Sequence, residues 1–392
     1  MRTVIEFYDK DIIKNILGVL ALRPERVVYL YDSELKDRHA FVSLENCFKA
    51  HIPDIIVESY PVNINDINCM YDAAKRIIAE SSESFVDLTG GSELMIIAGH
   101  KTEDLPHNKT VHTDIIGGRI FHIETNETLA QIPRLSLKDF FNARGAVLSG
   151  NSHNAPNPED FDNILDMCGH IFRNQKPWKE LCSFIQTAMG KTLPYDLLLH
   201  GKNIFNKSMD AIPFLLEKFE ENGFIKHLSV SKNSISFEFK DETAKSYLIS
   251  FGVWLELFVY INAVKSQAFD DVALGMMIDW DMYDQIQINN EIDVVISDNS
   301  VPVFVSCKFT EANTAALNEL LIAKKRLGGW FSKGVIVTFG EEKSKNTGTY
   351  QRALSLGLEL LDRDDVLSKD FQRRLVSSIK EHDLVKLKWK KI

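Results

Sequence analysis

Short apolar runs alternate with longer amphipathic segments in the N-terminal part of the chain. The apolar runs predict strands at Thr3–Phe7, Arg26–Tyr31, Asp54–Tyr60 and Phe85–Leu88. Helical spacing between them predicts helices at Asp11–Leu22, Leu44–Ala50 and Ile64–Ala79. Because strands that alternate with helices build parallel sheets, we expect an α/β fold that begins with a Rossmann-like parallel sheet.

A glycine-rich turn follows the fourth predicted strand. Glycines allow backbone N–H groups to approach a ligand closely, and the following helix N-terminus favours an anion. Ligands of parallel sheets collect beyond the carboxyl ends of the strands, where this turn would meet the end of the first strand. The candidate ligand-binding residues are therefore Tyr8, Asp9, Lys10, Thr89, Gly90, Gly91 and Ser92. The alternative is a plain strand-to-helix connection, since short glycine motifs are common.

The middle of the chain has a different pattern of apolar and polar residues. Helical spacing returns at Met209–Asn222, and two strand-like runs follow at Phe224–Val230 and Ser234–Phe239. A helix followed by a two-stranded wing resembles a winged-helix arrangement. Such a domain can read DNA or act as a rigid spacer, and we favour the spacer because fold does not determine function.

Two apolar, β-branched runs in the C-terminal part flank a polar turn and predict a β-hairpin. The runs are Asn290–Ile296 and Val301–Lys308. Because side chains alternate along a strand, Glu291 and Asp293 share one face, as do Ser306 and Lys308 on the partner strand. Charges in otherwise buried strands need a partner or a metal. The alternative to a metal is a cross-strand ion pair between Glu291 and Lys308.

This hairpin resembles the active site of the PD-(D/E)xK nuclease superfamily, which combines an acidic helix residue, a strand Asp and a (D/E)-x-Lys motif. The resemblance implies that Glu256 is the helix residue, while Ser306 occupies the usual acidic position of the motif. The implied catalytic residues are Glu256, Glu291, Asp293, Ser306 and Lys308. It also implies a divalent metal, Mn²⁺ or Mg²⁺, held by Glu256, Asp293 and the carbonyl of Cys307.

The N-terminal pattern, with its turn at Thr89–Met95, resembles the CARF domain, the cyclic oligoadenylate sensor of type III CRISPR systems. With the C-terminal motif, the whole chain resembles the nucleases that couple a CARF domain to a PD-(D/E)xK domain. The resemblance implies three domains: a CARF-like sensor at 1–150, a linker domain at 151–240, and a restriction-endonuclease-like α/β domain at 241–392.

The resemblance further implies a metal-dependent endonuclease that cleaves DNA and/or RNA in antiviral defence when cyclic oligoadenylate binds. Because a cyclic oligonucleotide has rotational symmetry, we expect a homodimer that binds one ligand across its two-fold axis. The alternative is a ligand-sensing regulator that binds DNA without cleaving it, and Ser306 in the acidic position keeps that alternative open.

The charge of the chain bears on how it can bind nucleic acid. A formal net charge of -10 argues against coating of nucleic acid by the whole surface, because a polyanion needs local positive potential. The basic C-terminal end, where Lys386, Lys388 and Lys390 alternate with Leu387 and Trp389, predicts either a protected strand edge or a nucleic-acid surface.

The cysteines and the apolar segments bear on the compartment. Five cysteines without metal-ligand spacing indicate reduced thiols, and Met1–Lys10 lacks the pattern of a secretory signal, so we expect a cytoplasmic protein. Tyr247–Val264 is apolar enough to suggest a membrane span. Glu256 near its centre favours a buried helix instead, and we expect no membrane association.

Overall fold

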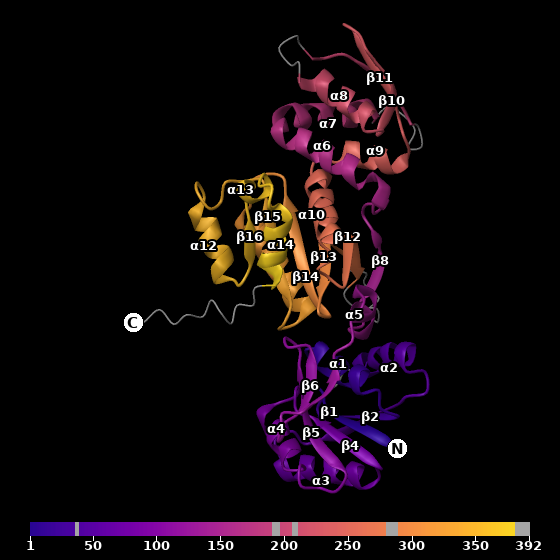
Figure 1. The fold of residues 1–392 in the computed structure, drawn as a ribbon, viewed down its shortest axis with the longest axis vertical. Helices are drawn as coiled ribbons and strands as arrows, with labels where there is room; N and C mark the ends of the chain where they lie inside the picture. The colour runs from indigo at the N-terminus through magenta and orange to yellow at the C-terminus, as the bar shows by residue number, and fades with distance from the viewer. Residues whose placement is uncertain (36–38, 190–196, 206–210, 280–288, 381–392) are drawn as a thin grey trace.

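The computed structural model describes residues 1–35, 39–189, 197–205, 211–279 and 289–380. Figure 1 shows three parts stacked along the long axis of the molecule. The sheet built by the C-terminal part of the sequence lies between the N-terminal domain and the middle segment.

The N-terminal domain is a seven-stranded sheet in the order β3-β2-β1-β4-β5-β6-β7. Its strands are β1 (Arg2–Phe7), β2 (Arg26–Asp32), β3 (Ile56–Val62), β4 (Glu83–Asp87), β5 (Asn108–Asp114), β6 (Arg119–His122) and β7 (Thr128–Gln131). The first five strands are parallel, and β6 and β7 are antiparallel. The predicted Rossmann-like sheet is therefore confirmed, and two antiparallel strands extend it.

Helices cover both faces of this sheet. They are α1 (Ile13–Leu22), α2 (His39–His51), α3 (Ile67–Ala79) and α4 (Glu93–His100). The apolar residues of α1 and α2 join one core, and those of α3 and α4 join a second core on the opposite face. The order β3-β2-β1-β4 puts the switch point of the sheet between β1 and β4, so the loops that follow these two strands lie side by side.

A six-stranded mixed sheet in the order β16-β15-β14-β13-β12-β8 forms the central part of the molecule. Its strands are β8 (Val147–Asn151), β12 (Asp271–Asp279), β13 (Asn289–Asp298), β14 (Val301–Lys308), β15 (Lys333–Thr338) and β16 (Glu359–Leu361). The β14, β15 and β16 strands are parallel, whereas the other pairs are antiparallel. The predicted domain boundary at residue 150 falls inside β8, which pairs with β12.

The predicted hairpin is present as β13 and β14, but its turn is tighter than the polar stretch suggests. Asp298 pairs with Val301, which leaves Asn299 and Ser300 as the two turn residues. Both have positive φ, 52° and 65°, as in the two-residue turns that match the twist of a hairpin. This turn fixes the register of the two strands that carry the predicted catalytic residues.

Helices cover the two faces of the central sheet. They are α10 (Val253–Ser266), α11 (Thr314–Ala323), α12 (Thr347–Ser355), α13 (Arg363–Val366), α14 (Phe371–Lys380) and the π-helix η2 (Lys324–Gly328). Buried residues of α10 and α14 join the core on one face, and those of α11 and α12 join the core on the other. No single helix in the described residues is long and apolar enough to cross a membrane, and the only pair to pass that test together is bent by 119°.

The middle segment is a small α/β unit. It contains η1 (Pro158–Asp160), α6 (Phe161–Arg173), α7 (Gln175–Met189), β9 (Leu198–Lys202), α8 (Ala211–Glu221), β10 (Ile225–Val230), β11 (Ser234–Phe239) and α9 (Glu242–Ile249). The predicted helix and two-stranded wing are confirmed, and β9 adds a third strand beside β11. One continuous core runs from this unit through Trp254 of α10 to Val305 of β14, so the unit is packed onto the central sheet.

Several contacts join the N-terminal domain to the central sheet, among them one aromatic contact and one hydrogen bond between loops. The first is α5 (Leu137–Ala143), where the ring of Phe141 lies 6.3 Å from that of Phe304 on β14. The second is the loop after η2, where the backbone N–H of Trp330 donates a 2.7 Å hydrogen bond to Oδ2 of Asp11, just before α1. Burial raises the pKa of Asp11, which is only 9% exposed.

Gly329 is required at the second contact. Its φ is 77°, and a Cβ there would overlap the Asp11 carboxyl group. We expect Gly329→Ala to lower the free energy of unfolding by about 2 kcal/mol or more, from backbone strain and displacement of Asp11. Chemical denaturation measures this change. Gly348→Ala is the control, because a Cβ on Gly348 of α12 meets open space and should be tolerated. Equal effects of the two substitutions would contradict the role assigned to Gly329.

Candidate active site

The hairpin brings four of the sequence-predicted residues together. The pairing of Val294 with Val305 continues toward Asp293 and Ser306, which therefore lie opposite each other on β13 and β14. The Asp293 carboxylate accepts hydrogen bonds from the backbone N–H of Cys307 at 2.6 Å and from the Ser306 hydroxyl at 3.4 Å. Its Oδ2 also lies 3.9 Å from Nζ of Lys308. The carboxylate is thus held at one point by the opposite strand.

Glu256, in the first turn of α10, lies near enough to the hairpin for Asp293, Glu291 and Lys308 to shift its pKa. The pKa of Glu256 is raised to about 8, mainly by burial and in addition by the nearby carboxylates of Asp293 and Glu291, while Lys308 acts in the opposite direction. Its Oε2 is buried and has no hydrogen-bond partner among the described residues. A buried carboxyl group that faces other carboxylates and has an unpaired oxygen is a site where a cation would be stabilised.

The remaining predicted residues differ in their environment. Burial raises the pKa of Asp293, and Lys308 and the Cys307 N–H oppose that rise. Burial also raises the pKa of the Cys307 thiol well above its usual value. A protonated thiol is a poor metal ligand, so the group of this residue that fits a hard cation is its backbone carbonyl oxygen. Glu291 is exposed at the rim of the site.

His153 is part of this environment, although no sequence motif marks it. It follows β8, and the Ser152 N–H donates a 2.7 Å hydrogen bond to the Gly275 carbonyl of β12. Burial lowers the pKa of His153, while Glu291 and Asp293 act in the opposite direction. Its Nδ1 is buried and lacks a hydrogen-bond partner in the described part of the chain. The only local signal would have been the short stretch Val147–Asn151, which forms β8 and has just two apolar residues.

The donor set fits a hard divalent cation that keeps several waters. In the described residues, no three His, Cys, Asp or Glu side chains lie close enough to hold a metal on their own. Mg²⁺, however, usually takes one or two carboxylates and retains water. Glu256, Asp293 and the Cys307 carbonyl supply that number of oxygens, and the unpaired Oε2 of Glu256 is available.

The predicted ligand-binding residues, except Gly90, line two clefts at the switch point of the N-terminal sheet. A cleft of about 580 Å³ is lined by Tyr8, Asp9, Lys10, Asp32, Glu34, Leu35, Ile64, Gly91, Ser92 and Met95. Thr89 instead lines a second cleft, of about 360 Å³, on the side of the central sheet. A Cβ on Gly90 would lie 2.7 Å from the Phe7 carbonyl, so this glycine is needed for the close approach of the turn to β1.

Backbone N–H groups of this turn are already hydrogen-bonded within the chain. The Gly91 N–H donates to Asp9 at 3.2 Å, and the Thr89 N–H donates to Asp87 at 2.9 Å. Ser92 caps α4 by accepting a hydrogen bond from the Met95 N–H. The glycines therefore have a structural role, and a ligand in the larger cleft would meet mainly side chains. The basic residues at 386–391 lie outside the described residues.

Comparison with known proteins supports the fold and the C-terminal domain. Residues 241–376 match the family model described as Card1-like, endonuclease domain. No curated protein sequence matches the chain.

Solved structures resemble nearly the whole chain. Protein VC1899 from Vibrio cholerae superposes with a TM-score of 0.77 at 16% identity, over 97% of this chain and 98% of that one. Can2 from Sulfobacillus thermosulfidooxidans, in complex with cyclic tetra-adenylate, gives 0.70 at 15% identity over 96% and 99%. A type III CRISPR defence DNA nuclease activated by cyclic oligoadenylate gives 0.53 at 14% identity over 86% of this chain and 45% of that one. Residues 241–376 are thus similar to the Card1-like endonuclease domain, in a chain that has the fold of VC1899 and Can2.

Proposed function

We propose that this protein is a metal-dependent endonuclease that cyclic oligoadenylate switches on, and that it cleaves DNA and/or RNA in antiviral defence in the cytoplasm. The observation that carries the proposal is the convergence of Glu256, Asp293 and Lys308 inside a Card1-like endonuclease domain. The activator is supported by two proteins of the same fold, one bound to cyclic tetra-adenylate and one activated by cyclic oligoadenylate.

The site residues have distinct chemical tasks in this proposal. Glu256, Asp293 and the Cys307 carbonyl would hold Mg²⁺ or Mn²⁺, which supplies a water of lowered pKa and neutralises phosphate charge. Lys308 holds a positive charge beside Asp293, where it can orient water or offset charge on the phosphate. Ser306 donates its hydroxyl to Asp293 and keeps that carboxylate aligned.

The N-terminal domain supplies the proposed sensor. Its larger cleft lies where β1 and β4 end, and its lining carries Lys10 together with the carboxylates of Asp9, Asp32 and Glu34. Asp9 is already paired with Lys14 at 2.9 Å, so part of the acidic charge is neutralised within the chain. We propose that two chains form a homodimer around one cyclic ligand. Mass measurement in solution and calorimetry would detect the dimer and the ratio of one ligand per two chains; an active monomer would contradict it.

A cleavage assay tests the proposed activity. The purified chain is mixed with single-stranded DNA, duplex DNA or single-stranded RNA, with Mg²⁺, Mn²⁺ or EDTA, and with cyclic oligoadenylates of different ring size. We expect cleavage only when both a metal and one of the activators are present. Activator-dependent DNA binding without cleavage under any metal condition would instead support the regulator, the alternative that Ser306 in the acidic position keeps open.

Ser306→Glu tests how the serine limits the metal site. The added carboxylate would lie opposite Asp293, where it can donate an oxygen to the cation, so we expect about ten-fold tighter binding of Mg²⁺. Titration of metal against cleavage rate and against intrinsic fluorescence measures the change. Ser306→Ala is the control, since it removes only the hydroxyl bond to Asp293. If Ser306→Glu weakens both metal binding and activity, Ser306 belongs to a different set of ligands.

A further inference from the structure

Trp330 is a large aromatic residue on a well-anchored loop, yet 86% of it is exposed. Its backbone N–H is bonded to Asp11. The Ser332 hydroxyl donates to the carbonyls of Gly329 at 2.7 Å and Lys324 at 3.1 Å, which ties the loop to η2. Burial of an indole ring is strongly favourable, so a fixed backbone that presents this ring to solvent indicates a surface for stacking.

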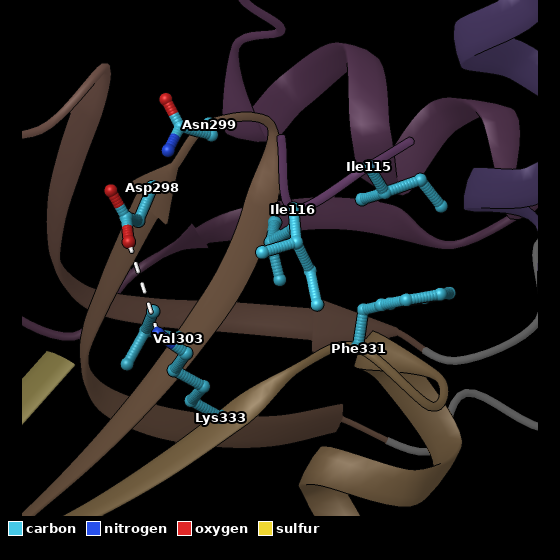
Figure 2. Close-up of a pocket in the computed structure, with 8 residues that line it drawn as sticks. Ile115, Ile116, Asp298, Asn299, Val303, Phe331 and Lys333 are labelled. Carbon is cyan, nitrogen blue, oxygen red and sulfur yellow. Dashed lines mark ion pairs between the residues drawn. The ribbon is translucent and has the colours of Figure 1, made fainter. Parts of the chain in front are cut away.

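The ring borders the second cleft, which is shared by the two domains. The N-terminal domain contributes Lys14, Thr89, His112, Thr113, Asp114, Ile115 and Ile116 to the lining, and the endonuclease domain contributes Trp330 and Phe331. A cavity of about 50 Å³ adjoins this cleft and is lined by apolar residues and by the ion pair of Asp298 and Lys333. Figure 2 shows Ile115 and Ile116 on one side of it and Phe331 of the other domain nearby. The cleft thus continues into a mainly apolar region at the domain junction.

Two threonine hydroxyls of this cleft are held in place by one buried carboxylate, that of Asp87. Thr89 Oγ1 donates to Asp87 at 2.5 Å and accepts the Thr113 N–H at 2.7 Å. Thr113 Oγ1 also donates to Asp87, at 2.7 Å. The His112 ring nitrogen Nδ1 lies 3.4 Å from Thr89 Oγ1. Because both hydroxyl protons go to Asp87, the group that can meet the hydrogen-bonding edge of a planar ring, such as a purine base stacked on the exposed indole, is the imidazole of His112.

The lining of the smaller cleft carries one lysine, Lys14, and one carboxylate, Asp114, which lies 3.9 Å from Arg119. Lys14 lies between the two clefts, because its Nζ pairs with Asp9 of the larger cleft while its side chain lines the smaller one. The Thr89–Gly91 turn separates the two clefts and contributes to both. A ligand with several bases joined by phosphates could therefore occupy the larger cleft and extend one base past the turn.

We propose that the smaller cleft is a subsite for one adenine ring of the cyclic oligoadenylate activator, stacked on Trp330. This inference rests on the proposed function and adds a residue of the endonuclease domain to the activator site. The stacked base would touch the loop that contains Trp330. This loop follows α11 and η2, which connect it to β14, the strand that carries Ser306 and Lys308. An activator shifts the equilibrium between two arrangements of the domains only if it binds one arrangement more tightly than the other. The contact with Trp330 would provide such a difference, because it depends on how the two domains are arranged.

Calorimetry with cyclic tetra-adenylate, and with cyclic hexa-adenylate as a second probe, tests the inference on full-length variants. We expect Trp330→Ala to weaken binding of the activator about ten- to a hundred-fold, and Trp330→Phe to retain most of the affinity. Tyr60→Ala is the control, because Tyr60 is 45% exposed on β3, outside both clefts, and its loss should leave binding unchanged. Thermal unfolding and mass measurement in solution accompany each variant.

Three outcomes would overturn the inference. Unchanged affinity of Trp330→Ala for an activator that the wild type binds would remove Trp330 from the site and leave the proposed function standing. Dissociation of a ligand-free dimer by Trp330→Ala would identify the ring as a contact between two copies of the chain. Failure of the wild type to bind any cyclic oligoadenylate would refute the proposed activator itself, and with it the subsite.

Discussion

Asp293→Asn and Lys308→Ala are each expected to reduce activator-dependent cleavage about a thousand-fold or more, because each removes a charge from the point where the phosphate must react. The asparagine keeps an oxygen that can accept the Cys307 N–H, so the hairpin should remain folded. Lys308 is partly exposed and contributes little to folding through its 3.9 Å contact with Asp293. Gel-based cleavage rates at saturating activator measure the effect.

The matched control is Glu319→Gln, which neutralises an exposed carboxylate on α11 of the same domain. We expect this variant to cleave at the wild-type rate. Calorimetry should give the same activator affinity for all three variants, since none of these residues lines either cleft of the N-terminal domain. Substantial cleavage by both site variants would refute the active-site assignment.

Glu256→Gln is expected to stabilise the metal-free protein while abolishing its activity. The pKa of Glu256 is raised from an ordinary value of 4.5 to about 8, so the folded chain keeps a proton that the unfolded chain releases. The stability that the protonated form provides is present below the unfolded pKa and is lost as pH rises toward 8. Removing this carboxyl group should therefore raise the free energy of unfolding at about pH 8 by roughly 2–4 kcal/mol, with little difference at about pH 5.

Urea denaturation in EDTA across this pH range, followed by tryptophan fluorescence, measures the predicted difference. Saturating Mg²⁺ should reverse it, because a bound cation stabilises the ionised Glu256 of the wild type and offers the glutamine much less. A variant that is less stable than the wild type at every pH would show that Glu256 has a favourable partner in the folded protein. The site would then be a structural carboxyl cluster.

The local parts of the candidate active site can be predicted from the sequence. Asp293, Ser306 and Lys308 lie on strands joined by a two-residue turn, so alternation along the strands and the turn register are enough to bring them together. Glu256 interrupts an apolar helix, and a buried charge in such a helix is itself a signal. The sheet order of the N-terminal domain follows in the same way from alternating strands and helices.

Contacts between segments that are far apart in the sequence cannot be predicted from local patterns. His153 enters the site only because β8 pairs with β12 far along the chain, and a five-residue strand has no periodicity that specifies its partner. The bond between Asp11 and Trp330 joins two loops from different domains, and neither loop has a pattern that predicts the other. The close approach of Gly90 to Phe7 cannot be predicted either, because it depends on how the turn packs against β1.

The position of β8 has a consequence for synthesis and dissection of the protein. During translation, β8 emerges well before its partner β12, and the whole middle segment is made between them. A fragment limited to residues 241–376, the span of the family match, would leave the β12 edge without its natural neighbour and would truncate α14. Open strand edges pair with other chains, so such a fragment should aggregate. Fragments meant to act as an independent nuclease should therefore begin upstream of Val147.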